Sequence, residues 1–109
     1  MDAELGELIR LSPLFGGASA EVAERLLAAS RIQSYAKGAA VFHQGDPAMA
    51  IGLVVSGWMK LFRMSAGGNE AVVRMFSAGE SFGEAVALRG TSYPASGGAV
   101  TDCRVLWIN

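Results

Sequence analysis

The chain has 109 residues, of which 51% are hydrophobic and 17% are charged, and its formal net charge is −1. This composition is too apolar for a disordered chain, and the length allows one domain with a modest core. The chain lacks the basic excess that neutralises phosphates, which argues against nucleic-acid binding by this segment itself.

Residues 1–30 predict a helical lead-in. A short helix is expected over 2–10, where acidic residues come first and Arg10 comes last, as the helix dipole favours. Ser19 is a plausible N-cap for a second helix over roughly 20–30. Its apolar positions recur with helical spacing on one face, at Val22, Leu26 and Ala29.

From residue 31 onward the pattern changes to short runs of Val, Ile, Phe and Leu separated by glycines, often at intervals of about ten residues. The clearest hairpin joins 58–64 to 70–76 through glycines that adopt positive φ at little cost. Apolar residues alternate with charged ones along 70–76, as in a half-buried strand. A closing strand is expected over 105–108. The regular turn signals are typical of a β-sandwich or a β-roll. The sequence therefore predicts one domain over 1–109, mainly β, with two N-terminal helices packed on a β-roll over 31–109.

Four motifs then follow one another in a suitable order: "KGAAVFHQGDPA" at 37–48, "VVSGWMKLFR" at 54–63, "GGNEAVV" at 67–73 and "GESFGEAVAL" at 79–88. Together they resemble the sensor domain of the Crp–Fnr family of bacterial transcription regulators. The resemblance implies a double-stranded β-helix, or jelly roll, of the cyclic-nucleotide-binding type that holds a small-molecule effector. It also implies a dimerisation helix and a helix-turn-helix domain after the roll. We therefore expect the sensor portion of a longer homodimeric regulator, which contacts DNA only through a C-terminal domain outside this chain.

In cyclic-nucleotide-binding members of this family, a loop and a short helix form a phosphate cassette, which corresponds here to the stretch from Gly79 to about Ser96. Gly83 lets the backbone turn, and Glu84 and Ala85 would open a helical turn whose free N–H groups face an anion. By family analogy, Glu84 accepts hydrogen bonds from a ribose hydroxyl.

The family's phosphate-binding arginine and its following serine or threonine fall by spacing at Pro94-Ala95, and neither residue can bond a phosphate through its side chain. A buried phosphate without its cation costs about 3–5 kcal/mol, which lowers affinity by a factor of hundreds to thousands, so tight cyclic AMP binding is not expected. Ser96 keeps a hydroxyl one position later, and Arg89 and Arg104 lie on either side of this pair. The candidate effector-binding residues are Gly83, Glu84, Ala85, Arg89, Ala95 and Ser96.

The effector itself is left open. Some branches of the family lack the arginine pair, and "YPASGGAV" is similar to the branch that controls nitrogen-oxide respiration, parts of which bind haem. His43 is then a candidate haem ligand, against the alternative of a polar residue in a turn. Cys103, the single cysteine, excludes an intrachain disulfide and is expected to be a small buried residue in a late strand.

Two other classes of function compete with a sensor. A β-roll enzyme of the cupin type needs two or three histidines, and one histidine argues against an enzyme. A purely structural or protein-interaction domain would fill its own pocket with side chains. Trp58 and Trp107 are expected to pack at the surface of the roll or at a dimer interface, with the lining of a pocket as the alternative. The acidic N-terminus and the absence of a run of about 20 apolar residues indicate a cytoplasmic domain without a membrane span.

Overall fold

The structure is a computed structural model that describes residues 19–108. The helix expected over 2–10 lies outside the described residues. The second expected helix is present as α2 (Ala20–Ala28) and ends two residues early, because Ser30 already pairs with Ile108 in a sheet. Ser19 caps it as predicted: its hydroxyl oxygen accepts a hydrogen bond from the Val22 N–H at 3.2 Å.

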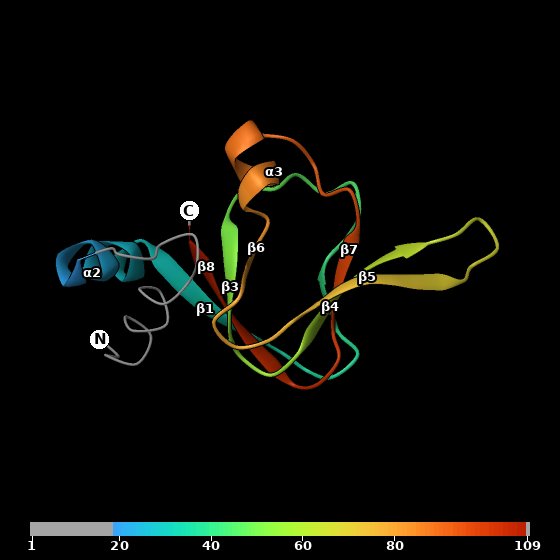
Figure 1. Ribbon diagram of the computed structural model, residues 1–109, viewed down its shortest axis with the longest axis horizontal. Helices are drawn as coiled ribbons and strands as arrows, with labels where there is room; N and C mark the ends of the chain where they lie inside the picture. Colours follow the sequence, from blue (N-terminus) through green and yellow to red (C-terminus); the bar gives the residue numbers. More distant parts are fainter. Residues whose placement is uncertain (1–18, 109) are drawn as a thin grey trace.

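Eight strands form two four-stranded antiparallel sheets that face each other (Figure 1). The first sheet has the order β1-β8-β3-β6, with bounds β1 (Ser30–Tyr35), β8 (Cys103–Ile108), β3 (Ile51–Ser56) and β6 (Ser81–Phe82). The second has the order β2-β7-β4-β5, with bounds β2 (Ala40–Phe42), β7 (Ser96–Ala99), β4 (Met59–Met64) and β5 (Glu70–Phe76). Most neighbours are far apart in the chain, as a jelly roll requires. The predicted fold class is confirmed.

The predicted hairpin corresponds to β4 and β5, which extend away from the roll beyond the rest of their sheet (Figure 1). Its turn closes with a hydrogen bond from the Ser65 N–H to the Asn69 carbonyl at 2.8 Å, and Gly68 adopts a φ of 83°. The expectation of a half-buried strand over 70–76 is wrong, because every residue of β5 except Phe76 is exposed. Alternation marks two different faces of this strand, but the opposite sheet does not reach far enough to cover either face.

The core between the sheets is largely aromatic. The Phe42 and Tyr93 rings stack with centroids 4.0 Å apart, and the Phe82 ring meets Trp107 edge-on at 5.4 Å. Gly52 gives the Phe82 ring its space, since a Cβ there would lie 2.1 Å from the ring's Cζ. Trp107 is buried, and its Nε1–H donates to the Tyr35 hydroxyl at 3.0 Å, so the expectation of surface packing is wrong for this tryptophan. The other tryptophan, Trp58, is exposed in the turn before β4.

Candidate functional site

The entry to the predicted cassette is a tight turn from β6 into the helix α3 (Glu84–Arg89). Gly83 adopts the left-handed conformation with a φ of 78°, and its carbonyl accepts a hydrogen bond from the Ala87 N–H at 2.9 Å. Gly90 ends the helix with a φ of 67°. Glu84 is half-buried and makes no side-chain hydrogen bond to the part of the chain that the structure describes. Ala85 and Arg89 are exposed on α3.

A second carboxylate fixes the turn that leads into the cassette. The Glu80 Oε1 atom accepts hydrogen bonds from the Ser77 N–H at 2.8 Å and from the Ser77 hydroxyl at 3.1 Å. Arg74 lies 3.4 Å from the other oxygen of Glu80. The Ser77 backbone bond, with help from Arg74, lowers the pKa of Glu80 below its ordinary value. The charge of Glu80 is therefore satisfied within the turn, whereas Glu84 stays available for a ligand.

The exit from the cassette runs from Tyr93 to Ser96. Pro94 is exposed, and Ala95 is buried, with 2% of its surface exposed. The Ser96 hydroxyl oxygen accepts a hydrogen bond from the Gln44 N–H at 2.9 Å, so it also holds the loop that follows β2. Ala95, the position at which the spacing predicts a phosphate-binding hydroxyl, thus presents a buried methyl group.

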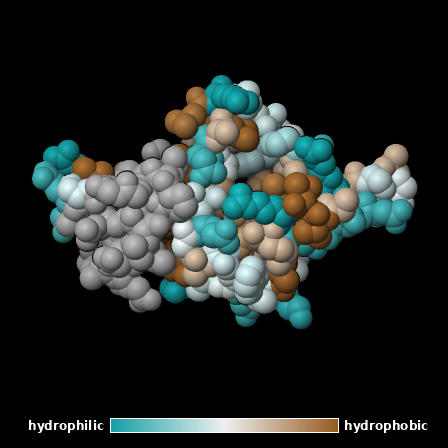
Figure 2. All heavy atoms as spheres, viewed as in Figure 1, coloured by the Kyte–Doolittle hydropathy of each residue, from teal (hydrophilic) through white to brown (hydrophobic). Residues whose placement is uncertain are grey.

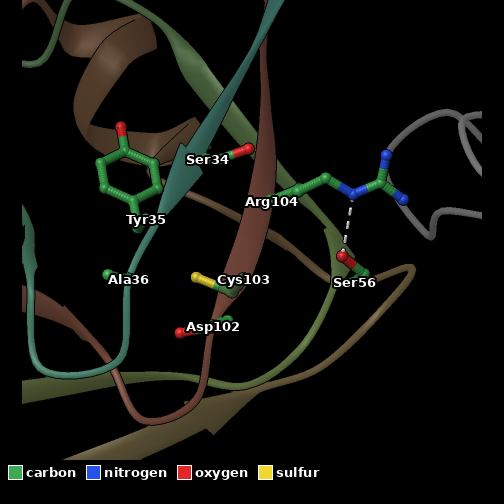
Figure 3. A pocket seen from close by; sticks show the side chains of 7 residues that line it. All are labelled: Ser34, Tyr35, Ala36, Ser56, Asp102, Cys103 and Arg104. Carbon is green, nitrogen blue, oxygen red and sulfur yellow. Dashed lines mark hydrogen bonds between the residues drawn. The ribbon is translucent and has the colours of Figure 1, made fainter.

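Arg104 does not move into the cassette. It lies on β8, and its Nε–H donates to the Ser56 hydroxyl on the neighbouring strand β3 at 3.1 Å. Figure 3 shows its side chain on the side of β8 opposite that of Cys103. Since Val105 and Trp107 belong to the core between the sheets, Arg104 projects from the outer face of its sheet. Arg89, at the exposed end of α3, is the cassette's own arginine, five positions before Pro94.

His43 lies in an exposed turn instead of inside the roll. Its N–H donates to the Asp46 carboxylate at 3.0 Å, and its Nδ1 lies 3.6 Å from the same oxygen. Residues 19–108 contain no group of three or more His, Cys, Asp or Glu side chains that could hold a metal ion. A haem iron needs an axial ligand within an apolar pocket. His43 is exposed at an open cavity between β1 and β2 instead of being enclosed by apolar residues, and it is engaged by Asp46, so the structure favours the turn interpretation.

Cys103 is buried at the start of β8, as predicted. Burial raises the pKa of its thiol above the ordinary value, and the nearby Asp102 raises it further. Both effects disfavour the thiolate, which is the reactive form.

We therefore expect Cys103 to react with a thiol reagent at least about 100-fold more slowly in the folded chain than in urea, because labelling must await local opening. The measurement is the labelling rate followed by absorbance. As a control, Ser92→Cys in a Cys103→Ala background places a thiol at an exposed position and should react quickly while folded. Equal rates for Cys103 in the folded and unfolded chains would contradict its burial.

One residue at the site was missed from the sequence. Tyr93 is buried, and its ring lies against the turn that begins α3: a Cβ on Gly83 would lie 3.5 Å from the Tyr93 Cε1. The backbone of Tyr93 pairs with the loop after β2, donating to the Asp46 carbonyl at 2.9 Å. The sequence around Tyr93 does not indicate that its side chain is buried here. The burial depends on pairing with Asp46, which lies 47 positions earlier in the chain.

Within the described residues, no helix is long and apolar enough to cross a membrane.

Comparisons with known proteins agree with this geometry. The family model of the cyclic nucleotide-binding domain matches residues 32–109. The chain is 38% identical over 95 residues to the cyclic AMP receptor protein of Thermus thermophilus, which covers 87% of this chain and 44% of that protein.

Solved structures of regulatory proteins are similar to this chain in both sequence and fold. A regulatory protein from Silicibacter pomeroyi DSS-3 is 45% identical with a TM-score of 0.90, over 98% of this chain and 49% of that one. The sensor domain of the transcriptional regulator DNR from Pseudomonas aeruginosa is 30% identical with a TM-score of 0.85, over 94% of this chain and 69% of that one. The chain spans less than half the length of the first two relatives. It belongs to the cyclic nucleotide-binding domain family, among the sensor domains of Crp–Fnr-type regulators.

Proposed function

We propose that this chain is the effector-sensing domain of a bacterial transcription regulator, and that it holds its effector without an arginine–phosphate ion pair. The absence of an arginine–phosphate ion pair is supported by the residues at the exit of the cassette. Pro94 and the buried Ala95 occupy the positions of the family's arginine and its hydroxyl partner. An effector with a buried phosphate would remain without a counter-charge there, which is costly.

Within this proposal the cassette still receives the effector. Glu84 is the carboxylate that accepts a hydrogen bond from an effector hydroxyl, since Glu80 is already engaged by Ser77 and Arg74. In this proposal Gly83 and Ala85 allow close approach to the first turn of α3, and Ala95 and Ser96 are assigned to the other side of the effector site. Arg89 lies at the exposed end. Such a lining suits an effector with hydroxyl groups and little negative charge.

The regulatory role is supported by the relatives, which are named as a receptor protein and as transcriptional regulators. We propose that residues 1–109 act as one sensor unit, with 1–30 as a helical lead-in. A dimerisation helix and a DNA-binding domain would belong to the remainder of the regulator. The extended hairpin offers that remainder an apolar surface, because Met64, Val72, Val73 and Met75 are all exposed on it. Figure 2 shows hydrophobic surface beside the root of this hairpin.

The test is the response of the full regulator in a reporter strain. Glu84→Ala should reduce the effector response at least about tenfold, because a hydrogen bond to a charged group is worth roughly 1.5–3 kcal/mol. Glu24→Ala makes the same change at an exposed position of α2 and should leave the response unchanged. An unaltered response in a folded Glu84→Ala regulator would refute this role for the cassette.

A further inference from the structure

A cavity opens at an edge of the roll, and it shares one lining residue, Tyr93, with the exit of the cassette. It lies between the edge strands β1 and β2, one from each sheet, and its volume is about 370 Å3. The cassette instead follows β6, the opposite edge strand of the first sheet. A volume of this size is in the range of small-molecule sites, which run from about 300 to 1,000 Å3.

Buried aromatic rings form the inner wall of this cavity, and the polar residues Arg31, Gln33, His43 and Asp46 also line it. Phe42, Tyr93 and Trp107 all line it and are part of the aromatic core. The Arg31 guanidinium lies over the Trp107 ring at 6.0 Å from its centroid. An aromatic ligand gains both burial and ring contacts against such walls.

One polar group in the wall has no partner. The Tyr93 side chain is buried, with 7% exposed, and its hydroxyl makes no hydrogen bond within residues 19–108. Burial, followed by the influence of Tyr35 and Asp46, raises the pKa of Tyr93, so the phenol stays protonated and keeps its donor. Buried hydroxyls nearly always find a hydrogen-bond partner, and an unpaired one is costly. The hydroxyl lies beside the turn at Gly83, since a Cβ there would be 3.8 Å from it. It can therefore anchor a ligand whose acceptor reaches that end of the ring.

The charged groups at the cavity mouth already have partners and carry opposite signs. Arg31 donates to the Gln33 side-chain oxygen at 2.7 Å, and the Asp46 carboxylate accepts from the His43 N–H at 3.0 Å. Neither sign dominates, so the lining offers no strong attraction to an ion. The ligand that fits is uncharged.

We propose that the cavity between β1 and β2 binds a small, uncharged, planar aromatic molecule whose single hydrogen-bond acceptor receives the proton of the Tyr93 hydroxyl. The ring of Tyr93 forms the wall between this cavity and the turn at Gly83. An occupant that shifts the ring therefore contacts the first turn of α3 through it. The cavity shares Tyr93 with the cassette, but its test does not depend on the function proposed above, because quinoline binding and the Glu84→Ala response are measured separately.

The probe is quinoline, a planar ring system with one acceptor nitrogen, titrated into the 109-residue chain and followed by the indole N–H signals in 1H–15N spectra. The Trp107 signal should shift, because Trp107 lines the cavity, whereas that of the exposed Trp58 should not. Tyr93→Phe should weaken quinoline binding about 3- to 10-fold. Naphthalene lacks the acceptor and should bind both forms equally.

A variant that fills the cavity tests whether quinoline binds there. Ala40 lines the cavity and is exposed, so Ala40→Phe should fill the mouth and abolish the Trp107 shift without disturbing the core. Ala71→Phe makes the same change on β5, away from the cavity, and should leave the titration unaltered. Three results would each overturn the proposal: no Trp107 shift up to millimolar quinoline, an undiminished shift in Ala40→Phe, or equal quinoline affinity in Tyr93→Phe.

Discussion

Replacing Pro94 with arginine and Ala95 with serine should raise the cyclic AMP affinity of this chain about 100- to several-thousand-fold, which corresponds to the roughly 3–5 kcal/mol lost when a buried phosphate has no cation. The turn geometry needed for the pair is already in place. Gly83 and Gly90 bound α3 in left-handed conformations, and the exit strand begins at Ser96. Serine adds a single oxygen at the buried position of Ala95, and Pro94 is exposed, so neither change should disrupt the core.

Calorimetry on the purified chain measures this effect. The unchanged chain should give no isotherm at micromolar concentrations, and the double variant should give a clear one. Ser92→Arg with Ala95→Ser supplies the same charge at a neighbouring exposed position and should gain far less. The interpretation of the cassette fails if the unchanged chain binds in the micromolar range, or if the double variant and the misplaced arginine bind equally.

Gly52→Ala should lower the free energy of unfolding by about 1–3 kcal/mol, although it adds a single methyl group. That methyl would lie 2.1 Å from the Cζ atom of Phe82. The ring cannot move aside easily, because Phe42, Phe76 and Trp107 surround it with centroids 5.4–5.7 Å away. Interiors packed this tightly resist even small additions of volume.

Urea unfolding followed by Trp107 fluorescence gives the measurement. Gly67→Ala is the matched control, since its new methyl group would meet nothing closer than the Ser65 Oγ at 3.9 Å, and we expect little change in stability. Phe82→Leu removes the clashing ring, so the double variant should lose less stability than the sum of its parts. A Gly52→Ala chain as stable as Gly67→Ala would show that the ring is not fixed.

The sequence was sufficient for the features that depend on local chemistry. Ser19 as an N-cap, the glycines of the hairpin turn and Gly83 at the start of α3 all act through their own backbone or their nearest neighbours. The resemblance of four motifs added the jelly-roll topology, which local periodicity alone left open between a sandwich and a roll.

Features that depend on distant partners could not be predicted. The alternation along β5 is typical of a half-buried strand, but no local pattern indicates that the opposite sheet stops short of it. Trp58 and Trp107 are both flanked by apolar residues, and only the pairing of β8 between β1 and β3 places the latter in the core. Tyr93 is buried through its pairing with the loop after β2. At the cassette, the missing cation could be predicted from spacing, whereas the engagement of Arg104 by Ser56 required the structure.

The two ends of α3 differ in how firmly they are attached, and this limits how the domain can move. After the helix, residues 91–93 are tied to the loop at 45–48 by three backbone hydrogen bonds of 2.9–3.1 Å. The helix itself spans six residues between two glycines and contains no buried side chain. Val86 and Ala87 of α3 pack against the core while remaining partly exposed. If a ligand contacts the cassette, any displacement is therefore expected in the six residues of α3, between Gly83 and Gly90, and not in the hydrogen-bonded segment that follows.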